Sequence, residues 1–224
     1  MNGEVVNISK KYGKNQILRG VSFAINGGET IGIIGANGSG KSTLLRILAG
    51  VIKADEGQFL SDGVDLLSRG AGNRVAYVPQ GTPLIEELNA YDNLRLWYEK
   101  DALKKSLESG MLKELGIGDF LKKPVKKLSG GMRKRLSVGC SIANDPEIML
   151  LDEPTAALDL AAKERLKAFV GDFVKRGGAA VLVTHDAQEL KECTRCYLLC
   201  DGVLSAIEDV DGQTLLKKLN SHEK

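Results

Sequence analysis

The sequence is poor in aromatic side chains and contains no long hydrophobic run. Phenylalanine, tyrosine and tryptophan make up 5% of the 224 residues, which argues against a surface that stacks nucleic-acid bases. No apolar run approaches the ~18–20 residues that span a bilayer, and the N-terminal Met1-Asn-Gly-Glu4 lacks the features of a secretory signal. The net charge of +2 creates no strong field for a polyanion. We therefore expect a cytosolic protein, or one that reaches a membrane through a partner.

Cysteine is also scarce, and the arrangement of three of the four cysteines leaves two interpretations open. The pattern Cys193-x-x-Cys196-x-x-x-Cys200 could hold a metal or support redox chemistry, but no histidine lies within it. Cys196 and Cys200 flank an apolar run, so on a strand they would share a face, which Cys193 need not join. We favour the interpretation that all three are small buried hydrophobic residues.

The hydrophobic pattern predicts an α/β fold with a mainly parallel sheet. Apolar residues make up 43% of the chain, which is typical of a protein with a packed core. Alternating apolar residues over the first 34 positions predict an N-terminal antiparallel β region. Three short apolar runs in the rest of the chain predict buried strands separated by helices, the arrangement of a parallel sheet. These runs are 75–78, 147–151 and 179–183.

Residues 81–144 have a different character, because helical spacing dominates there. We expect them to form a helical insert within a single domain of 224 residues, whose α/β core comprises about 1–80 and 145–224. The helices expected in the insert are 90–100, 102–115 and 131–143.

A glycine-rich stretch from Gly35 to Thr43 matches G-x-x-x-x-G-K-[ST] at every fixed position. An apolar run precedes it and a segment with helical spacing follows, and this strand–loop–helix context supports the motif over a chance glycine-rich turn. Such a loop points backbone N–H groups at phosphate oxygens, and the helix adds its positive end. Lys41 can reach the β- and γ-phosphates, and Ser42 can ligate Mg²⁺. The predicted nucleotide-binding residues here are Gly35, Asn37, Gly38, Ser39, Gly40, Lys41, Ser42 and Thr43.

Polar side chains follow each of the three later apolar runs, and strand carboxyl ends are where ligands bind in open α/β sheets. Asp152 can hold Mg²⁺ through a water, and Glu153 can act as general base toward the attacking water. His185 can donate to a γ-phosphate oxygen, and Gln80 can position both metal and water. The competing interpretations are a helix cap for the acidic pair, a structural histidine and an ordinary loop glutamine.

The stretch Leu128-Ser-Gly-Gly-Met132 opens a predicted helix and forms a second candidate anion site. Ser129 is a good N-cap, and Gly130 and Gly131 expose backbone N–H groups. The helical insert separates this second site from the loop at Lys41. The two sites of one chain would therefore not both bind the phosphates of one nucleotide. We expect the second site to serve a nucleotide held by another subunit.

These motifs, in this order, resemble those of the nucleotide-binding subunit of an ABC transporter, over nearly the whole chain. Gly35–Ser42 resembles the Walker A loop and 148–153 the Walker B strand with its catalytic glutamate. Leu128–Met132 resembles the LSGGQ signature, although Met132 stands where the family usually has glutamine. The remaining matches are Gln80 with the Q-loop, Asp159 with the D-loop, His185 with the switch histidine and Tyr12 with the aromatic that stacks on adenine.

The resemblance implies a P-loop NTPase core, ATP and Mg²⁺ as cofactors, and hydrolysis of ATP. It implies a head-to-tail dimer, with a second copy or a homologous subunit, in which Ser129, Gly130 and Gly131 of one chain contact the ATP held by the other. Separate transmembrane permease subunits would use the energy and hold the protein at the inner face of the cell membrane. The Gly-Gly-Met-Arg-Lys-Arg135 pattern resembles members that pair with ABC-2-type exporter subunits, so we expect export.

The segment 84–97 is a candidate contact for a membrane partner, with Tyr91, Leu94 and Trp97 at helical spacing. The equally weighted alternative is that these three residues pack inside the insert.

Two other function classes compete with transport. A non-transport ABC ATPase would act on nucleic acid or ribosomes, and a basic cluster at 122–127 and 133–135 could suit that role, but a solvated helix face explains it more simply. An inactive binding module is disfavoured because Lys41, Glu153 and His185 are all present. We expect no nucleic-acid partner.

Overall fold

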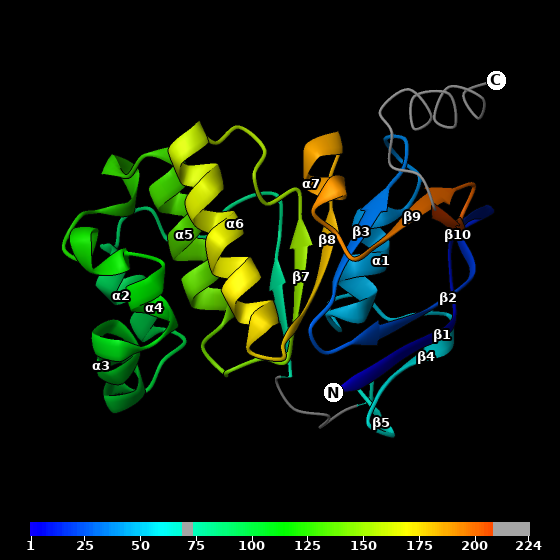
Figure 1. Cartoon of the computed structure of the whole chain (residues 1–224), viewed down its shortest axis with the longest axis horizontal. Helices are drawn as coiled ribbons and strands as arrows, with labels where there is room; N and C mark the ends of the chain where they lie inside the picture. The colour runs from blue at the N-terminus through cyan, green and yellow to red at the C-terminus, as the bar shows by residue number, and fades with distance from the viewer. Residues whose placement is uncertain (69–73, 208–224) are drawn as a thin grey trace.

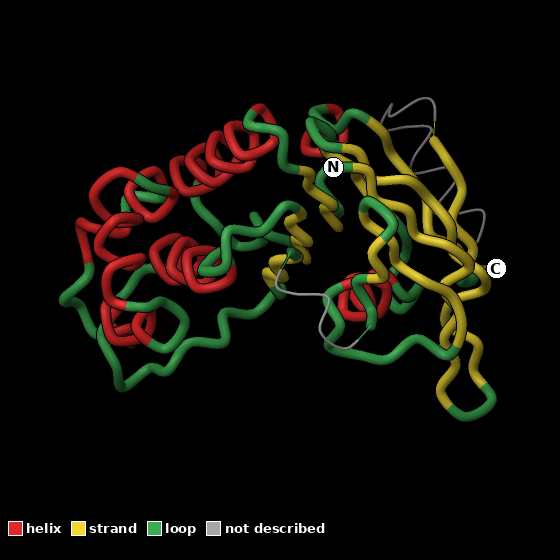
Figure 2. Tube along the Cα trace, turned by 90° about the horizontal axis from the view of Figure 1, so that it is seen from below, coloured by secondary structure: helices red, strands yellow, loops and turns green. Residues whose placement is uncertain are grey.

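The computed structural model describes residues 1–68 and 74–207. Two sheets lie beside a group of helices, with the strand-rich half at the right of Figure 1 and the helical half at the left. The same division is visible from below in Figure 2. The first sheet has four antiparallel strands in the order β2-β1-β4-β5. Its members are β1 (Asn2–Tyr12), β2 (Asn15–Asn26), β4 (Glu56–Ser61) and β5 (Val64–Asp65).

The second sheet has six strands in the order β10-β9-β3-β8-β7-β6. All neighbouring pairs are parallel except β9 and β10, which form a hairpin, so the prediction of a mainly parallel sheet is confirmed. The strands are β3 (Thr30–Ile34), β6 (Val75–Val78), β7 (Ile148–Asp152), β8 (Ala179–Val183), β9 (Arg195–Cys200) and β10 (Val203–Ile207).

Helices connect the parallel strands and fill the region between β6 and β7. The α-helices are α1 (Lys41–Leu48), α2 (Ala90–Arg95), α3 (Lys100–Ser109), α4 (Met111–Glu114), α5 (Gly130–Ser141), α6 (Leu160–Lys175) and α7 (Ala187–Lys191). Two short 3-10 helices, η1 (Ile117–Phe120) and η2 (Val125–Lys127), precede α5.

Two helices predicted in the insert are shorter than expected. The helix predicted over 90–100 ends at Arg95, where bonds such as Trp97 N–H to Leu94 O, 2.9 Å, tighten the last turn. The helix predicted over 102–115 is broken at Gly110, whose backbone is extended. A Cβ at Gly110 would lie 2.9 Å from the Cα of Ser106, so the break depends on glycine.

Side chains alternate across the parallel sheet and build a separate hydrophobic core on each face. On β7, Ile148 and Leu150 pack with α1 and the antiparallel sheet, whereas Met149 and Leu151 pack with α5, α6 and the insert. All four side chains are 0–1% exposed, as expected for a strand covered on both faces. The sheet is therefore held rigidly between two layers, and its strand ends have fixed positions.

The hydrophobic interpretation of the three cysteines holds in part, because Cys196 is buried whereas Cys193 and Cys200 are only partly buried. Cys196 is buried with Leu190 and Leu198, and Cys200 shares its face. Cys193 packs against the same cluster, so it joins the other two, which the strand pattern did not require. Within residues 1–68 and 74–207 no group of three or more metal-ligating side chains is arranged for a metal. No helix in that part of the chain is long and apolar enough to cross a membrane.

Segment 84–97 has both buried and exposed apolar residues, so each of the two alternatives, packing inside the insert and contact with a partner, applies to part of it. Leu94 is 0% exposed and belongs to the core of the insert, whereas Tyr91 and Trp97 are 38% and 61% exposed. Two further apolar residues nearby in the sequence are exposed, Ile85 at 45% and Leu96 at 58%. Leu94 therefore packs within the insert, and Ile85, Tyr91, Leu96 and Trp97 remain available on its surface; we call these four residues the insert patch.

We predict that Leu94→Ala and Trp97→Ala differ sharply in stability. Leu94→Ala leaves a cavity in the insert core and should lower the free energy of unfolding by about 2–5 kcal/mol. Trp97→Ala removes a largely exposed side chain and should change it by less than about 0.5 kcal/mol. Urea unfolding followed by circular dichroism measures both. Equal losses for the two variants would contradict the assignment of Leu94 to the core.

Candidate functional site

The carboxyl ends of four parallel strands meet at one level of the sheet. Ile33 of β3 and Asp152 of β7 both pair with Val183 of β8, and Val78 of β6 pairs with Leu151. Each strand is followed directly by a segment that carries predicted site residues. Residues that are more than a hundred positions apart in the sequence are thereby brought into contact.

The loop after β3 wraps around the side chain of Lys41. Gly38 and Gly40 have φ of 81° and 103°, a left-handed backbone that favours glycine. A Cβ at Gly35 would lie 2.3 Å from the Leu199 carbonyl oxygen, so this position also requires glycine. α1 begins at Lys41, after Gly40, without a side-chain cap, so its first N–H groups point into the loop.

The Lys41 ammonium is buried in this loop. Its Nζ donates to the carbonyl oxygens of Gly35 at 2.7 Å and Ala36 at 2.8 Å, and the residue is 6% exposed. Burial lowers the pKa of Lys41, and the nearby carboxylates of Glu153 and Asp152 partly oppose this shift. The loop therefore holds a cation whose present partners are two neutral carbonyls, which a phosphate oxygen can replace.

Ser42 and Asp152 meet across the gap between α1 and β7. Ser42 Oγ lies 3.1 Å from Asp152 Oδ1, and the hydroxyl of Tyr77 donates to Asp152 Oδ2 at 3.3 Å. Asp152 is 3% exposed. A hydroxyl and a buried carboxylate side by side are the hard oxygen ligands that Mg²⁺ prefers, so these two residues fit the predicted metal site.

Glu153 is the centre of a second group of contacts. Gln80 Nε2 donates to Glu153 Oε2 at 2.8 Å, and His185 Nε2 lies 3.1 Å from Glu153 Oε1. The three predicted catalytic residues are thus in mutual contact through Glu153. Gln80 approaches Glu153 rather than the pair formed by Ser42 and Asp152, so its predicted metal role stays a prediction.

The backbone of Glu153 is held in an uncommon conformation. Its φ is 45°, in the left-handed region, and its N–H donates to the Val183 carbonyl oxygen at 2.9 Å. A residue other than glycine in this region costs energy and persists where surrounding contacts enforce it, which is typical of functional sites. The turn after β7 therefore directs this carboxylate toward Gln80 and His185.

The signature segment lies in a separate hollow. Ser129 caps α5 by accepting from Met132 N–H at 3.3 Å, and Asp159 caps α6 by accepting from Ala162 N–H at 2.8 Å. Residues from both caps line a cavity of about 170 Å³, whereas Glu153 and His185 line a different one of about 320 Å³. The first cavity is lined by Ser129, Gly131, Met132, Arg135, Asp159, Ala161, Ala162 and Arg165, and Gly130 is exposed beside it. The signature segment and the pair Glu153–His185 therefore line different cavities of one chain.

Tyr12 lies at the end of β1 and is 51% exposed. The Lys10 ammonium lies 5.5 Å from the centre of its ring. The predicted role of Tyr12 toward adenine remains a prediction.

One prediction about charge is wrong. Lys134 was expected on a solvated basic face, but it is 4% exposed, and its Nζ donates to the carbonyl oxygens of Pro79 at 2.8 Å and Gln80 at 3.2 Å. Burial lowers the pKa of Lys134 to about 8, against the opposing effect of Asp152 and Glu153. The other lysines of the cluster, at 122, 123, 126 and 127, are exposed as expected.

Lys134 and Tyr77 are the two residues near the carboxylates that sequence reasoning missed. A signal for Lys134 was available, because it lies three positions after the signature glycine Gly131 and four before Val138, on the buried stripe of α5. Tyr77 gave no such signal, since it stands within an apolar strand and its hydroxyl reaches Asp152 only through the pairing of β6 with β7.

The chain is similar to known ATP-binding proteins along most of its length. The model of the family described as "ABC transporter" matches residues 18–156. A putative ABC transporter ATP-binding protein from Pyrococcus furiosus is 33% identical, with 96% of this chain and 82% of that protein covered. The lantibiotic transport ATP-binding protein SrtF of Streptococcus pyogenes is 29% identical, over 98% of this chain and 96% of that protein.

Solved structures of the same class have the same fold. An ATP-binding subunit of an ABC transporter superposes with a TM-score of 0.83 at 24% identity, covering 99% of this chain and 98% of that one. The ATP-binding cassette MJ0796, in a dimeric post-hydrolysis state bound to ADP and Pi, superposes with a TM-score of 0.80 at 29% identity, covering 94% and 99%. Since the family model matches more than half of its residues, the chain belongs to the ABC transporter family, as its ATP-binding and ATP-hydrolysing subunit.

Proposed function

We propose that this chain binds ATP and Mg²⁺ at Gly35–Thr43, dimerises around two ATP molecules and powers export by separate membrane subunits. We take residues 1–224 as one ABC-type domain, with 81–144 as its helical insert. The observation that carries the proposal is the contact of Ser42 with Asp152 and of Gln80 and His185 with Glu153, all at one edge of the sheet.

Each residue at this edge has a distinct task in the proposal. The loop N–H groups and Lys41 bind the phosphates, and Tyr12 contacts the adenine ring. Ser42 and Asp152 hold Mg²⁺, with Gln80 as a further ligand, and the bound cation supplies charge stabilisation for the leaving phosphate. Glu153 accepts the proton of the attacking water, and His185 and Gln80 orient this carboxylate and the water. Buried Lys41 keeps its charge next to the phosphates, where the low dielectric strengthens the interaction.

The proposed dimer follows from the separation of the two hollows. Ser129 and Gly131 line one cavity, and Glu153 and His185 line another, so one chain supplies two halves of different sites. A head-to-tail arrangement with a second copy or a homologous subunit completes both, with Asp159 at the junction. The dimeric state of MJ0796, a structural relative, supports this arrangement.

The proposed membrane partner contacts the insert patch. The four apolar side chains of this patch are 38–61% exposed. Exposed apolar residues that gather in this way are typical of a surface that binds another protein. The chain would then be peripheral to the cytoplasmic face of the membrane, held there by permease subunits. Export is supported by relatives named for lantibiotic transport and for linearmycin resistance.

We predict that Lys41→Ala weakens ATP binding by about 10- to 150-fold, because a charge-assisted hydrogen bond contributes about 1.5–3 kcal/mol. Titration calorimetry with ATP and Mg²⁺ measures the change. Lys53→Ala, at a lysine after α1 and outside the loop, is the control and should leave the affinity unchanged. An unaltered dissociation constant in Lys41→Ala would overturn the role given to Lys41.

Glu153→Gln should stop hydrolysis while leaving nucleotide binding intact, and so trap the ATP-bound dimer. Loss of general-base assistance should lower the turnover rate by at least about 10²–10⁴-fold. Analytical ultracentrifugation in saturating ATP and Mg²⁺ detects the dimer, and the same sample without nucleotide is the control. A variant that binds ATP but stays monomeric contradicts the sandwich arrangement.

Trp97→Ala should reduce recovery of a membrane partner at least tenfold when the tagged chain is purified from detergent-solubilised membranes, because aromatic residues dominate such interfaces. Val203→Ala, a substitution of an exposed apolar residue in β10, is the matched control. Recovery of the wild-type chain with ribosomes or DNA, and without a membrane protein, would favour the non-transport alternative instead.

A further inference from the structure

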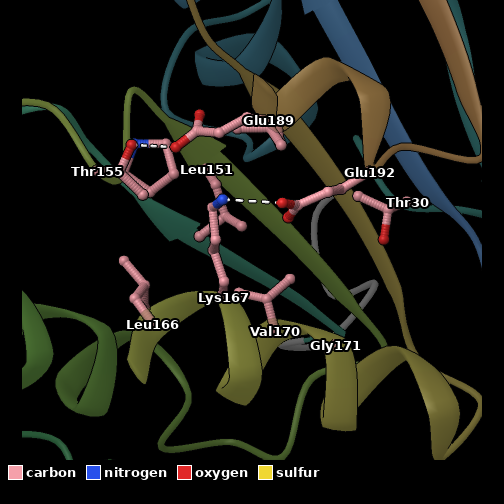
Figure 3. Close-up of a pocket in the computed structure, with 11 residues that line it drawn as sticks. Thr30, Leu151, Thr155, Leu166, Lys167, Val170, Gly171, Glu189 and Glu192 are labelled. Atoms are coloured by element: carbon pink, nitrogen blue, oxygen red, sulfur yellow. Dashed lines mark hydrogen bonds and ion pairs between the residues drawn. The ribbon is translucent and has the colours of Figure 1, made fainter. Parts of the chain in front are cut away.

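A buried carboxylate in α7 is not part of the predicted nucleotide site. Glu189 is 3% exposed, and a buried charge is costly unless polar groups satisfy it. Its two oxygens accept hydrogen bonds from two threonine hydroxyls: Oε1 from Thr155, and Oε2 from Thr184 at 2.5 Å. Figure 3 shows Glu189 directed at Thr155 across the wall of a pocket of about 200 Å³.

The two threonines belong to the segments that carry the catalytic residues. Thr155 lies two residues after Glu153, and Thr184 lies immediately before His185. Both threonines are buried, at 6% and 3% exposure. One carboxylate therefore joins the turn after β7 to the end of β8, beneath the 3.1 Å contact of His185 with Glu153.

Lys167, which lines the same pocket, is paired with a different carboxylate. Lys167 of α6 lines the same pocket, but its Nζ lies 2.9 Å from Glu192, and this ion pair spans the pocket in Figure 3. The pKa of Lys167 is raised chiefly by Glu192, and Glu189 makes the smallest of the contributions. The carboxylate of Glu189 thus depends on the two hydroxyls, and breaking either bond leaves a buried polar group unpaired.

Two further hydrogen bonds fix the segments that follow β7 and β8. Thr184 Oγ1 also accepts from Asp186 N–H at 3.0 Å, which closes the turn around His185. The Glu153 N–H donates to the Val183 carbonyl oxygen at 2.9 Å, so one backbone hydrogen bond already joins the two segments. Glu189 joins them a second time through Thr155 and Thr184, and two attachments restrict rotation of one segment against the other.

We propose that Glu189 is a positioning residue for ATP hydrolysis, which sets the orientation of His185 relative to Glu153 by holding Thr155 and Thr184. This inference rests on the proposed function, because it requires that Glu153 and His185 act in hydrolysis. The Glu189 carboxylate bonds Thr155 and Thr184 rather than Glu153 or His185, and among the described residues it makes no hydrogen bond to the loop that contains Lys41. Its loss therefore affects the chemical step and leaves nucleotide binding unchanged.

The test compares steady-state hydrolysis by Glu189→Ala and Glu189→Gln, with Glu192→Ala as the matched control three residues along the chain. Glu189→Ala is expected to lower kcat about 10- to 100-fold, the effect of a small misplacement, with KM within about threefold of wild type. Glu189→Gln is expected to recover most of kcat, because the amide offers an acceptor to one threonine and a donor to the other. Glu192→Ala should retain wild-type kcat.

A second comparison separates positioning from a merely structural role. If Glu189 acts through His185, adding Glu189→Ala to His185→Ala should lower kcat by less than about twofold, because coupled residues are not additive. A structural role would multiply the two losses. Rates are expressed per nucleotide-binding site, so unfolded protein in a sample does not lower the measured kcat. Should Glu189→Ala not fold, Thr184→Val takes its place in the same cycle with the same expectation.

Three results would overturn the proposal: unchanged kcat in the folded Glu189→Ala or Thr184→Val variant, a rise in KM alone, or multiplicative losses with His185→Ala. Failure of the proposed function looks different. In that case the wild-type chain itself does not hydrolyse ATP with Mg²⁺, or Glu153→Gln hydrolyses it at the wild-type rate.

Discussion

The parallel register of β3, β8, β7 and β6 is the constraint on which the rest of the structure depends. Because β3, β6, β7 and β8 end within one residue of the same level, each following turn enters the same space. A slip of one residue would send Asp152 to the opposite face of the sheet, away from Ser42. Full burial of β7 on both faces prevents that slip, since each face of the strand belongs to a different core. Packing thus determines the geometry of the site.

Local patterns predicted the parts of the structure that depend on neighbouring residues in the chain. Strand β8 lies at the predicted positions, and the Ser129 cap begins α5 where the serine and glycines indicated. The glycine-rich loop between β3 and α1 was predictable because the glycines of its pattern are required by the backbone itself, as at Gly40 with φ of 103°. In each case the physical cause acts within a few residues, so it is visible in the sequence.

Features that depend on a distant partner were missed or misjudged. Lys134 was interpreted as a surface charge: its place on the buried stripe of α5 was a signal of burial, but nothing nearby in the sequence reveals that the carbonyl oxygens of Pro79 and Gln80 will accept its ammonium protons. Glu189 was not singled out in the sequence, although its side chain joins Thr155 to Thr184. The break at Gly110 was hidden by helical spacing on both of its sides. The hydrophobic pattern of the sequence therefore could not predict the long-range polar contacts of this site.

The two buried lysines near the carboxylates differ in the carbonyl groups to which they donate. Lys41 and Lys134 approach Asp152 and Glu153 from α1 and α5, and burial lowers the pKa of each while the carboxylates oppose the shift. Lys41 donates to two carbonyls of its own loop, so exchanging them for phosphate oxygens breaks no contact with another element. Lys134 donates to carbonyls that hold Gln80 against Glu153, so moving it would dismantle the catalytic contacts. In the proposed function Lys41 exchanges its partners for phosphate oxygens, whereas Lys134 keeps its contacts with the carbonyl oxygens of Pro79 and Gln80.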